Sequence, residues 1–451
     1  MERIGAQEAG AANVPLPALA GPVQALTVAG QLIEQLRVLE DMKSAISGLQ
    51  AKIAVAFDQA QRQVQAEAGV PASERGRGVA AQVALARRES PNRGSRLLGF
   101  AKALVTEMPR TLAALDSGQL NEWRATLLVR ETACLSAEDR CAVDEELAAD
   151  SGTFDGAGDR SIVAAAKAAA YRRDPRSVTQ RAARAASERH VSLRPAPDTM
   201  AILTALLPVA QGVAAYKALA QSADSARSGG DDRSRGQVMA DTLVERLIGT
   251  SGGVGRLELQ LVMTDRTLFQ GDSEPARLSG YGIVPGGWAR ALVGEGGGAG
   301  INAGGPSPSS SELQAASGQG GSGSKGHNYD VYLRRLYTAP ASGELVAMDT
   351  RSRLFPGGLR RFIETRDAVC RTPYCDAPIR HIDHVVPWHS GGPTSLNNGA
   401  GLCEQCNHTK ESPGWSSTTV TALPMHSMDV RTPTGHTYRS KAPPLPGTAL
   451  H

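Results

Sequence analysis

The sequence predicts an α-rich protein of several domains with a minor β component (α+β). Apolar residues recur at helical spacing through most of residues 29–293, whereas strand-like alternation is confined to short segments. Four of the six cysteines lie between residues 370 and 406. A chain of 451 residues can form two or three separate cores. We therefore expect a mostly helical N-terminal domain, a small β-containing segment and a C-terminal module held together by zinc.

The N-terminal region begins with two contrasting segments. Residues 1–28 are rich in Ala, Gly and Pro, so we expect a disordered lead-in. From Leu32 to Ala56 the apolar residues follow steps of three and four, which predicts a long amphipathic helix. A stripe packed on the core of its own chain and a homodimer seam through residues 32–56 would both produce this pattern. We favour packing within the chain.

The remainder of this domain, to residue 293, is Ala-rich and helical, and its sequence does not indicate a function. Pro109, Gly118 and Pro175 mark helix ends. Residues 257–264 alternate between apolar and polar side chains, which predicts a small β element near the end of the domain. Helices are expected over residues 78–192, 197–222 and 236–249.

Four further segments follow the helical domain. Residues 294–326 are rich in Gly and Ser and predict a flexible linker. Residues 327–367 contain two alternating runs around a turn, then a helix, so they should form a hairpin and a helix. The compact module spans residues 368–415. The Pro and Thr content of residues 416–451 predicts an irregular tail.

The bulk composition excludes several classes of protein. No segment approaches the roughly 20 apolar residues that span a bilayer, and Glu2 and Glu8 interrupt any signal sequence. We therefore expect no membrane partner and a cytoplasmic location. The net charge of +3 says little about partners. In a reducing compartment, paired cysteines serve as metal ligands before they form disulfides.

The cysteine spacing predicts a structural zinc site. Cys370 and Cys375 form one pair, and Cys403 and Cys406 form the other. Two such pairs can supply four thiolates to one tetrahedral Zn²⁺ from two tight turns. A set of reduced, buried thiols is the alternative. Cys134 and Cys141 have no such context and are expected in helix cores.

A second set of ligand-type residues lies inside the cysteine frame. Asp383 offers a hard oxygen ligand, and His384 offers an imidazole that can take a proton near neutral pH. Asn398 precedes the second cysteine pair and Asn407 follows it. Together these residues predict a small metal-dependent hydrolytic site.

These residues resemble the HNH endonuclease family, which has a ββα-metal fold. The residues that match are Asp383-His384-x2-Pro387, Gly391-Gly392, Asn398 and Cys403-x2-Cys406-Asn407-x2-Lys410. The resemblance implies that His384 is the general base, that Asp383 and Asn407 bind the catalytic ion, and that Asn398 orients the base. His408 is the alternative to Asn407, and Asn397 is the alternative to Asn398. His381 and His389 are expected at the surface or on a phosphate.

The resemblance implies a metal-dependent endonuclease that hydrolyses DNA, with duplex a better candidate than single strands, using Mg²⁺ or Mn²⁺ beside the structural Zn²⁺. Two alternatives remain, a zinc-containing nucleic-acid-binding protein without catalysis and, third, a helical assembly protein.

A group of arginines near the module could bind phosphate. They are Arg351, Arg353, Arg360, Arg361, Arg366, Arg371 and Arg380.

The wider sequence resembles the actinobacterial 13E12 repeat family, in which a helical domain of unknown function precedes an HNH module. The resemblance covers most of residues 30–440. It rests on sequence segments that include Met108-Pro109-Arg110-Thr111, Gly280-Tyr281-Gly282 and the stretch from Arg351 to Asp367.

Overall fold

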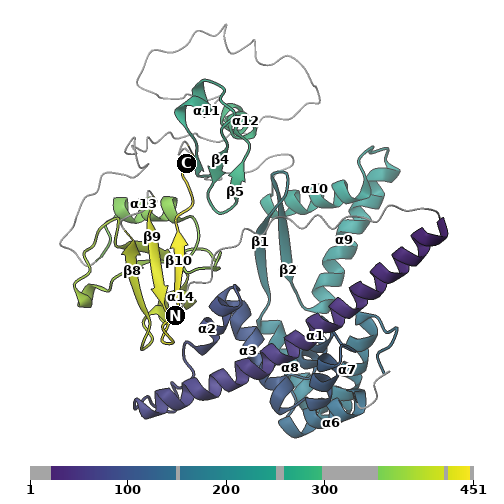
Figure 1. Cartoon of the computed structure of the whole chain (residues 1–451). Coiled ribbons are helices and arrows are strands. Elements are labelled where there is room, and N and C mark those ends of the chain that lie inside the picture. The colour runs from purple at the N-terminus through teal and green to yellow at the C-terminus, as the bar shows by residue number, and fades with distance from the viewer. Residues whose placement is uncertain (1–21, 149–152, 250–258, 297–353, 421–424, 447–451) are drawn as a thin grey trace. The chain divides into compact units, whose positions relative to one another are not determined.

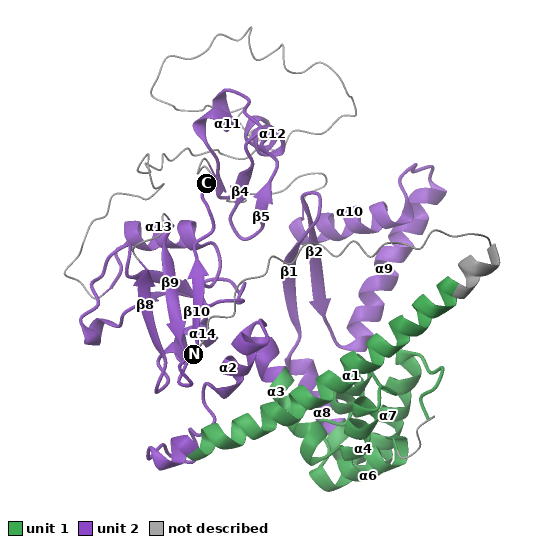
Figure 2. Cartoon of the chain, viewed as in Figure 1, with its two compact units in different colours: residues 1–63, 97–178 green, residues 64–96, 179–451 purple. Residues whose placement is uncertain are grey.

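Helices dominate the N-terminal part of the chain, and small sheets gather toward its C-terminus (Figure 1). The structure is a computed structural model that describes residues 22–148, 153–249, 259–296, 354–420 and 425–446. It has two compact units, residues 1–63 with 97–178 and residues 64–96 with 179–451 (Figure 2). The predicted α-rich class with small β elements is confirmed, while the predicted domain boundaries stay predictions.

The first unit is a helical bundle with one main core. Leu104 and Ile162 are fully buried in it. Local signals set the helix ends: Pro109 begins one helix, and Asn121 Oδ1 accepts a hydrogen bond from the N–H of Arg124 (2.9 Å) at the start of the next. The helices are α1 (Pro22–Glu67), α3 (Pro91–Thr106), α4 (Pro109–Asp116), α5 (Glu122–Glu131), α6 (Ala137–Ala148), α7 (Asp159–Arg173) and α8 (Pro175–Ser187), of which α1, α3 and α8 extend past the unit's limits.

Helix α1 packs on this bundle through its small residues. Ser44, Gly48 and Ala51 are buried on one face of the helix. A Cβ at Gly48 would meet the Asp116 carboxylate, which would have to move aside to admit a larger residue. Apart from Val55, which is buried, the large apolar residues between positions 32 and 56 are exposed. Our expectation that they pack within the chain is therefore wrong, because the small side chains approach the bundle instead.

The second unit contains a β-hairpin that overlaps two predicted helices, one ending at residue 192 and the other beginning at residue 197. Strand β1 (His190–Ala196) pairs antiparallel with β2 (Met200–Leu206). Asp198 and Thr199 both have a φ of 59°, and this turn reverses the chain where a helix was predicted from residue 197. The helices of this region are α2 (Val79–Ala86), α9 (Val209–Ser228) and α10 (Arg235–Ile248).

A small sheet lies near the end of the helical region, as predicted. Strands β3 (Leu261–Val262), β4 (Ala276–Leu278) and β5 (Gly282–Val284) pair antiparallel in that order. Their apolar side chains surround Ala276, Val284 and Ala289, which are buried. Helices α11 (Asp265–Phe269) and α12 (Gly286–Gly296) complete this part of the fold.

The C-terminal part joins a hairpin, a short helix and a second sheet. The predicted helix before the module is α13 (Gly357–Asp367). Strand β6 (His381–His384) pairs antiparallel with β7 (Gly399–Leu402), and α14 (Glu404–Lys410) follows at once, which gives the β–β–α order that the resemblance implied. The single-turn helix η1 (Trp388–Ser390) lies between the two strands.

The region after residue 415 is not the irregular tail that its composition predicted. It forms an antiparallel sheet of β8 (Ser416–Val420), β9 (Ser427–Arg431) and β10 (Thr437–Lys441), with β9 in the middle. Met428 and Val430 of β9 pack against Val385 and Ala400 of the hairpin. This shared core explains why the segment is ordered despite its Pro and Thr content.

Several predictions fall on residues that the structure does not describe. They are most of the lead-in (1–28), most of the linker (294–326), the hairpin before α13, and the arginines at positions 351 and 353. Among the described residues, every helix is too short or too polar to cross a bilayer.

Candidate metal centre

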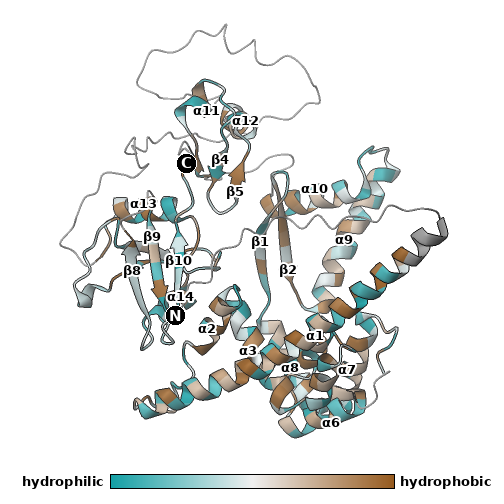
Figure 3. Cartoon of the chain, in the orientation of Figure 1, coloured by the Kyte–Doolittle hydropathy of each residue, from teal (hydrophilic) through white to brown (hydrophobic). Residues whose placement is uncertain are grey.

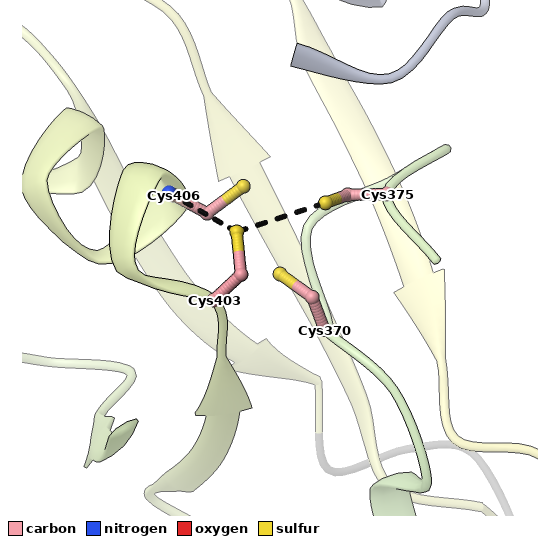
Figure 4. Close-up of side chains that lie close together, drawn as sticks. All are labelled: Cys370, Cys375, Cys403 and Cys406. Carbon is pink, nitrogen blue, oxygen red and sulfur yellow. Dashed lines mark hydrogen bonds between the residues drawn. The ribbon is translucent and has the colours of Figure 1, made fainter. Parts of the chain in front are cut away.

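The four paired cysteines meet in one cluster, as predicted. Cys370 and Cys375 lie in the loop after α13, whereas Cys403 caps α14 and Cys406 lies in its first turn. Their four Sγ atoms lie within 4.8 Å of one another, and Cys375 Sγ is 3.8 Å from Cys403 Sγ (Figure 4). Tetrahedral zinc with bonds of about 2.3 Å requires sulfurs about 3.8 Å apart. The cluster therefore fits a zinc ion.

The electrostatics of this cluster require a cation if all four thiols ionise. The thiols of Cys375 and Cys406 donate to Cys370 and lower the pKa of Cys370 to about 2. The same interactions with Cys370 raise the pKa of Cys406. One thiolate is thus stabilised at the expense of the others, and a divalent ion would relieve the repulsion. Cys134 is half-buried and Cys141 is exposed, so the prediction that both lie in helix cores is wrong.

His384 is the buried end of strand β6. Its ring lies next to two aromatic rings, that of Phe355, whose centroid is 4.7 Å away, and that of Trp388, at 5.8 Å. Nε2 of His384 lies 2.9 Å from Oγ1 of Thr394, and Nδ1 lies 3.7 Å from Oδ1 of Asp383. The ring is therefore fixed at one nitrogen by a hydroxyl, and its other nitrogen lies on the carboxylate side.

Asp383 is tied to both helix α14 and its own strand. Oδ1 accepts a hydrogen bond from the backbone N–H of His384 (2.8 Å), and Oδ2 lies 2.8 Å from Lys410 Nζ. Lys410 also donates to the carbonyl oxygen of His384 (2.9 Å). Burial alone would raise the pKa of Asp383, but Lys410 and the His384 N–H outweigh it and hold this pKa below its ordinary value. Asp383 is therefore an anion at neutral pH.

Asn398 closes the loop that joins the two strands. Its Oδ1 accepts from the N–H of Val386 (2.8 Å), and its Nδ2 donates to the carbonyl oxygens of Val386 (3.0 Å) and Pro393 (2.9 Å). A Cβ at Gly392 would overlap the Val386 carbonyl oxygen, so the loop can pass this close only with glycine there. Asn397 is exposed. Of the two asparagines, Asn398 is therefore the one whose side chain holds this loop.

Asn407 carries an unexplained polar atom. Its Oδ1 is buried and has no hydrogen-bond partner among the described residues. Such an unpaired buried oxygen is rare in proteins, and a metal ion bound to it would supply the missing partner. Asn407 is three residues before Lys410 on α14, so the two side chains share the helix face that reaches Asp383. His408 is exposed. Asn407 therefore brings a buried oxygen to this face, whereas His408 presents its side chain to solvent.

A buried charge network joins α13 to the hairpin and to the C-terminal sheet. Asp367 is fully buried and accepts from Arg366, Arg371 and the backbone N–H of Gly401. The guanidinium of Arg366 also donates to the carbonyl oxygens of Leu396 and Gly399. The network thus fixes the backbone on both sides of Asn398, at Leu396 and at Gly399 and Gly401.

The C-terminal sheet enters the same network through His426. Arg371 Nη1 lies 3.2 Å from Nδ1 of His426, and Arg371 also donates to Ser440 Oγ. Nε2 of His426 is 2.9 Å from the carbonyl oxygen of Asn397. Sequence reasoning missed this role, because a histidine and a serine in a Pro/Thr-rich segment carry no spacing signal.

The arginines near the module divide into two groups. Arg366 and Arg371 are buried, so the expectation that they contact phosphate is wrong: both neutralise Asp367 instead. Arg360, Arg361 and Arg380 are exposed. His381 and His389 are exposed as well, as expected.

Comparison with known families gives two matches. The chain matches the model described as HNH endonuclease over residues 370–412 and the model described as domain of unknown function (DUF222) over residues 36–266. No curated protein and no solved structure matches the chain. The predicted order of a domain of unknown function followed by an HNH module is thereby confirmed.

Proposed function

Because the chain belongs to the DUF222 family and carries an HNH endonuclease domain, we propose that it is an endonuclease that hydrolyses DNA phosphodiester bonds. The observation that carries this proposal is the buried, unpartnered Oδ1 of Asn407, on the helix face that reaches Asp383. A zinc module that only bound nucleic acid would have no use for such an oxygen beside a carboxylate and a fixed imidazole.

His384 is the general base in this proposal. In the tautomer that donates Nε2–H to Thr394 Oγ1, the lone pair is on Nδ1, which faces Asp383. Nδ1 can then take a proton from a water molecule that attacks the phosphorus. The rings of Phe355 and Trp388 lie next to the imidazole and limit the space in which it can turn.

Asp383 and Asn407 are the residues that would hold a divalent ion such as Mg²⁺ or Mn²⁺. Both offer hard oxygen atoms, the type of ligand that these ions prefer. The ion would neutralise charge on the phosphate and on the leaving 3′ oxygen. The products would be 5′-phosphate and 3′-hydroxyl ends. In the same proposal, Cys370, Cys375, Cys403 and Cys406 bind a structural Zn²⁺ that fastens the loop after α13 to α14.

Exposed cationic side chains support a polyanionic substrate. Arg360, Arg361 and Arg380 belong to the same part of the fold as His384 and are exposed, which suits contacts to a DNA backbone. Such contacts do not read sequence, so we propose duplex DNA as the substrate class without a target sequence. Binding through them should weaken as salt rises.

Supercoiled plasmid is the substrate that tests this function. We expect the purified protein to nick or linearise the plasmid with added Mg²⁺ or Mn²⁺ and to leave it intact with EDTA. Plasmid binding without cleavage in any divalent ion would instead support the alternative, a zinc-containing nucleic-acid-binding protein without catalysis.

A further inference from the structure

Helix α1 has two faces of opposite character. The face that meets the bundle carries Ser44, Gly48, Ala51 and Val55, all buried and small or medium in size. Helical geometry places Leu39, Met42, Ile46, Leu49 and Ile53 on the far side of the helix. Large apolar residues usually point inward in such helices, so here the usual polarity of an amphipathic surface helix is reversed.

The outward face is a continuous apolar stripe. Figure 3 shows hydrophobic residues along α1. The exposed fractions in the stripe run from 46% to 61%. The stripe is defined here as Leu32, Leu36, Leu39, Met42, Ile46, Leu49 and Ile53.

The spacing in the stripe is that of a coiled-coil seam. Leu39, Ile46 and Ile53 are seven residues apart, and Met42 and Leu49 lie three residues after the first two, which gives the a and d positions of successive heptads. This repeat makes side chains of one helix fit between those of another helix with the same repeat. A helix that merely lay beside a core would not need it.

We propose that the stripe is a homodimer interface, in which α1 of one copy pairs with α1 of a second copy. A second copy of the chain carries the same heptad repeat. In a two-fold dimer the same surface of each copy forms the interface, so the stripe of one copy can pack on the stripe of the other. The stripe has no charged member. The two lysines that flank it are each paired within the chain, Lys43 with Glu40 (2.7 Å) and Lys52 with Asp116 (2.6 Å), so the flanks carry little unpaired charge that would repel an identical helix.

The size of the stripe suits a stable dimer. Seven half-exposed large side chains amount to about 700 Å² of apolar surface, which exceeds the few hundred Å² usual on monomers and approaches the roughly 800 Å² per partner of a standard interface. The helix is also already formed and packed on the bundle along its opposite face. Pairing would therefore require little further ordering of the backbone.

Two isoleucines on α1 give a matched pair of variants for the test. Ile53 is 60% exposed and belongs to the stripe, whereas Ile33 is 59% exposed but lies about three helical turns before Ser44, on the other side of the helix. Ile53→Glu and Ile33→Glu make the same chemical change at equal exposure. Neither side chain is buried in the protomer, so circular dichroism should show unchanged helix content in both.

The experiment is sedimentation equilibrium of the full chain at micromolar concentration. We expect twice the 47.1 kDa chain mass for the wild type and for Ile33→Glu, and the mass of one chain for Ile53→Glu. A wild type with the mass of one chain would overturn the proposal, and so would a dimer that survives Ile53→Glu. If residues outside the described ranges cover the stripe, the wild type will have the mass of one chain, and the proposal is overturned. The readout does not depend on cleavage, so it stands apart from the proposed nuclease activity.

Discussion

Nε2 of His384 lies 2.9 Å from Oγ1 of Thr394, and both residues are buried. The hydroxyl comes from the loop between β6 and β7, which Asn398 closes and the Asp367 network fixes at its far end. The orientation of the imidazole therefore depends on buried side chains of this loop and of the Asp367 network. Such supporting bonds set the tautomer of a catalytic histidine and the direction of its other nitrogen.

Loss of the Thr394 hydroxyl should slow cleavage. Thr394→Val keeps the shape of the side chain but leaves Nε2 without this oxygen, so we expect the cleavage rate to fall by about 10- to 100-fold. Thr394→Ser retains the hydroxyl and is the matched control, with a rate near that of the wild type. The measurement is single-turnover plasmid nicking. Equal rates for the valine and serine variants would rule out a positioning role for this bond.

Asn407→Ala should weaken binding of the divalent ion without destabilising the fold. The buried Oδ1 of Asn407 has no partner to lose, so we expect the free energy of unfolding to change little. The Mg²⁺ concentration for half-maximal cleavage should rise by about tenfold or more, since one oxygen ligand is missing.

The neighbouring His408 provides the comparison. His408→Ala removes an exposed side chain and should leave the Mg²⁺ titration unchanged. If His408→Ala shifted the titration and Asn407→Ala did not, the ligand would be His408.

Cys403→Ser should release zinc and destabilise the module. Cys403 caps α14 and accepts from the N–H of Cys406, so its loss affects both the ion and the start of the helix. We expect zinc content, measured by mass spectrometry of metals, to fall well below one ion per chain. Cys141→Ser alters an exposed thiol outside the cluster and should retain the wild-type zinc content. Equal zinc in the two variants would mean that the cluster does not bind the ion.

His426 should make the C-terminal region less stable in acid. Burial, followed by the positive charge of Arg366, lowers the pKa of His426 to about 4, against 6.5 for an ordinary histidine. Between these values the unfolded chain binds a proton that the folded chain excludes. Stability is thus fully present above pH 6.5 and falls by about 3 kcal/mol as the pH drops to 4.

The variant His426→Gln removes this titration while it keeps a polar side chain. We compare the free energy of unfolding of the variant with that of the wild type at each pH. Between pH 6.5 and pH 4 this difference should change by about 3 kcal/mol in favour of the variant. Urea unfolding at several pH values gives the comparison. Protonation of the zinc ligands contributes to both proteins and cancels in the difference. Parallel curves would contradict the assignment.

The frame of the site could be predicted from sequence because its residues are close together along the chain. Cys370 to Cys406 and the pair Asp383-His384 lie in one short segment, so their spacing alone implied a common centre. The partners that orient them could not be found in this way. Lys410 was visible as part of the motif, yet its contact with Asp383 depends on how α14 packs against β6.

Elsewhere, local composition was a poor guide where packing decided the structure. The tail after residue 415 forms a sheet because Met428 and Val430 reach the core of the hairpin. The hairpin of β1 and β2 depends on two consecutive residues with positive φ, a conformation that Asp198 tolerates but that a β-branched residue such as Thr199 rarely adopts. The apolar repeat of α1 did predict a helix, but it could not say which of its faces the bundle would take.

The central claim is that His384 activates water for DNA hydrolysis, and single-turnover cleavage by His384→Gln tests it most directly. Glutamine fills much of the space that the imidazole occupies next to Phe355 and Trp388, so zinc content and the unfolding midpoint should stay close to wild type. A general base contributes about 10²- to 10⁴-fold to a rate, and we expect a loss in that range with saturating Mg²⁺ or Mn²⁺. Cleavage by the zinc-loaded variant at the wild-type rate would contradict the account.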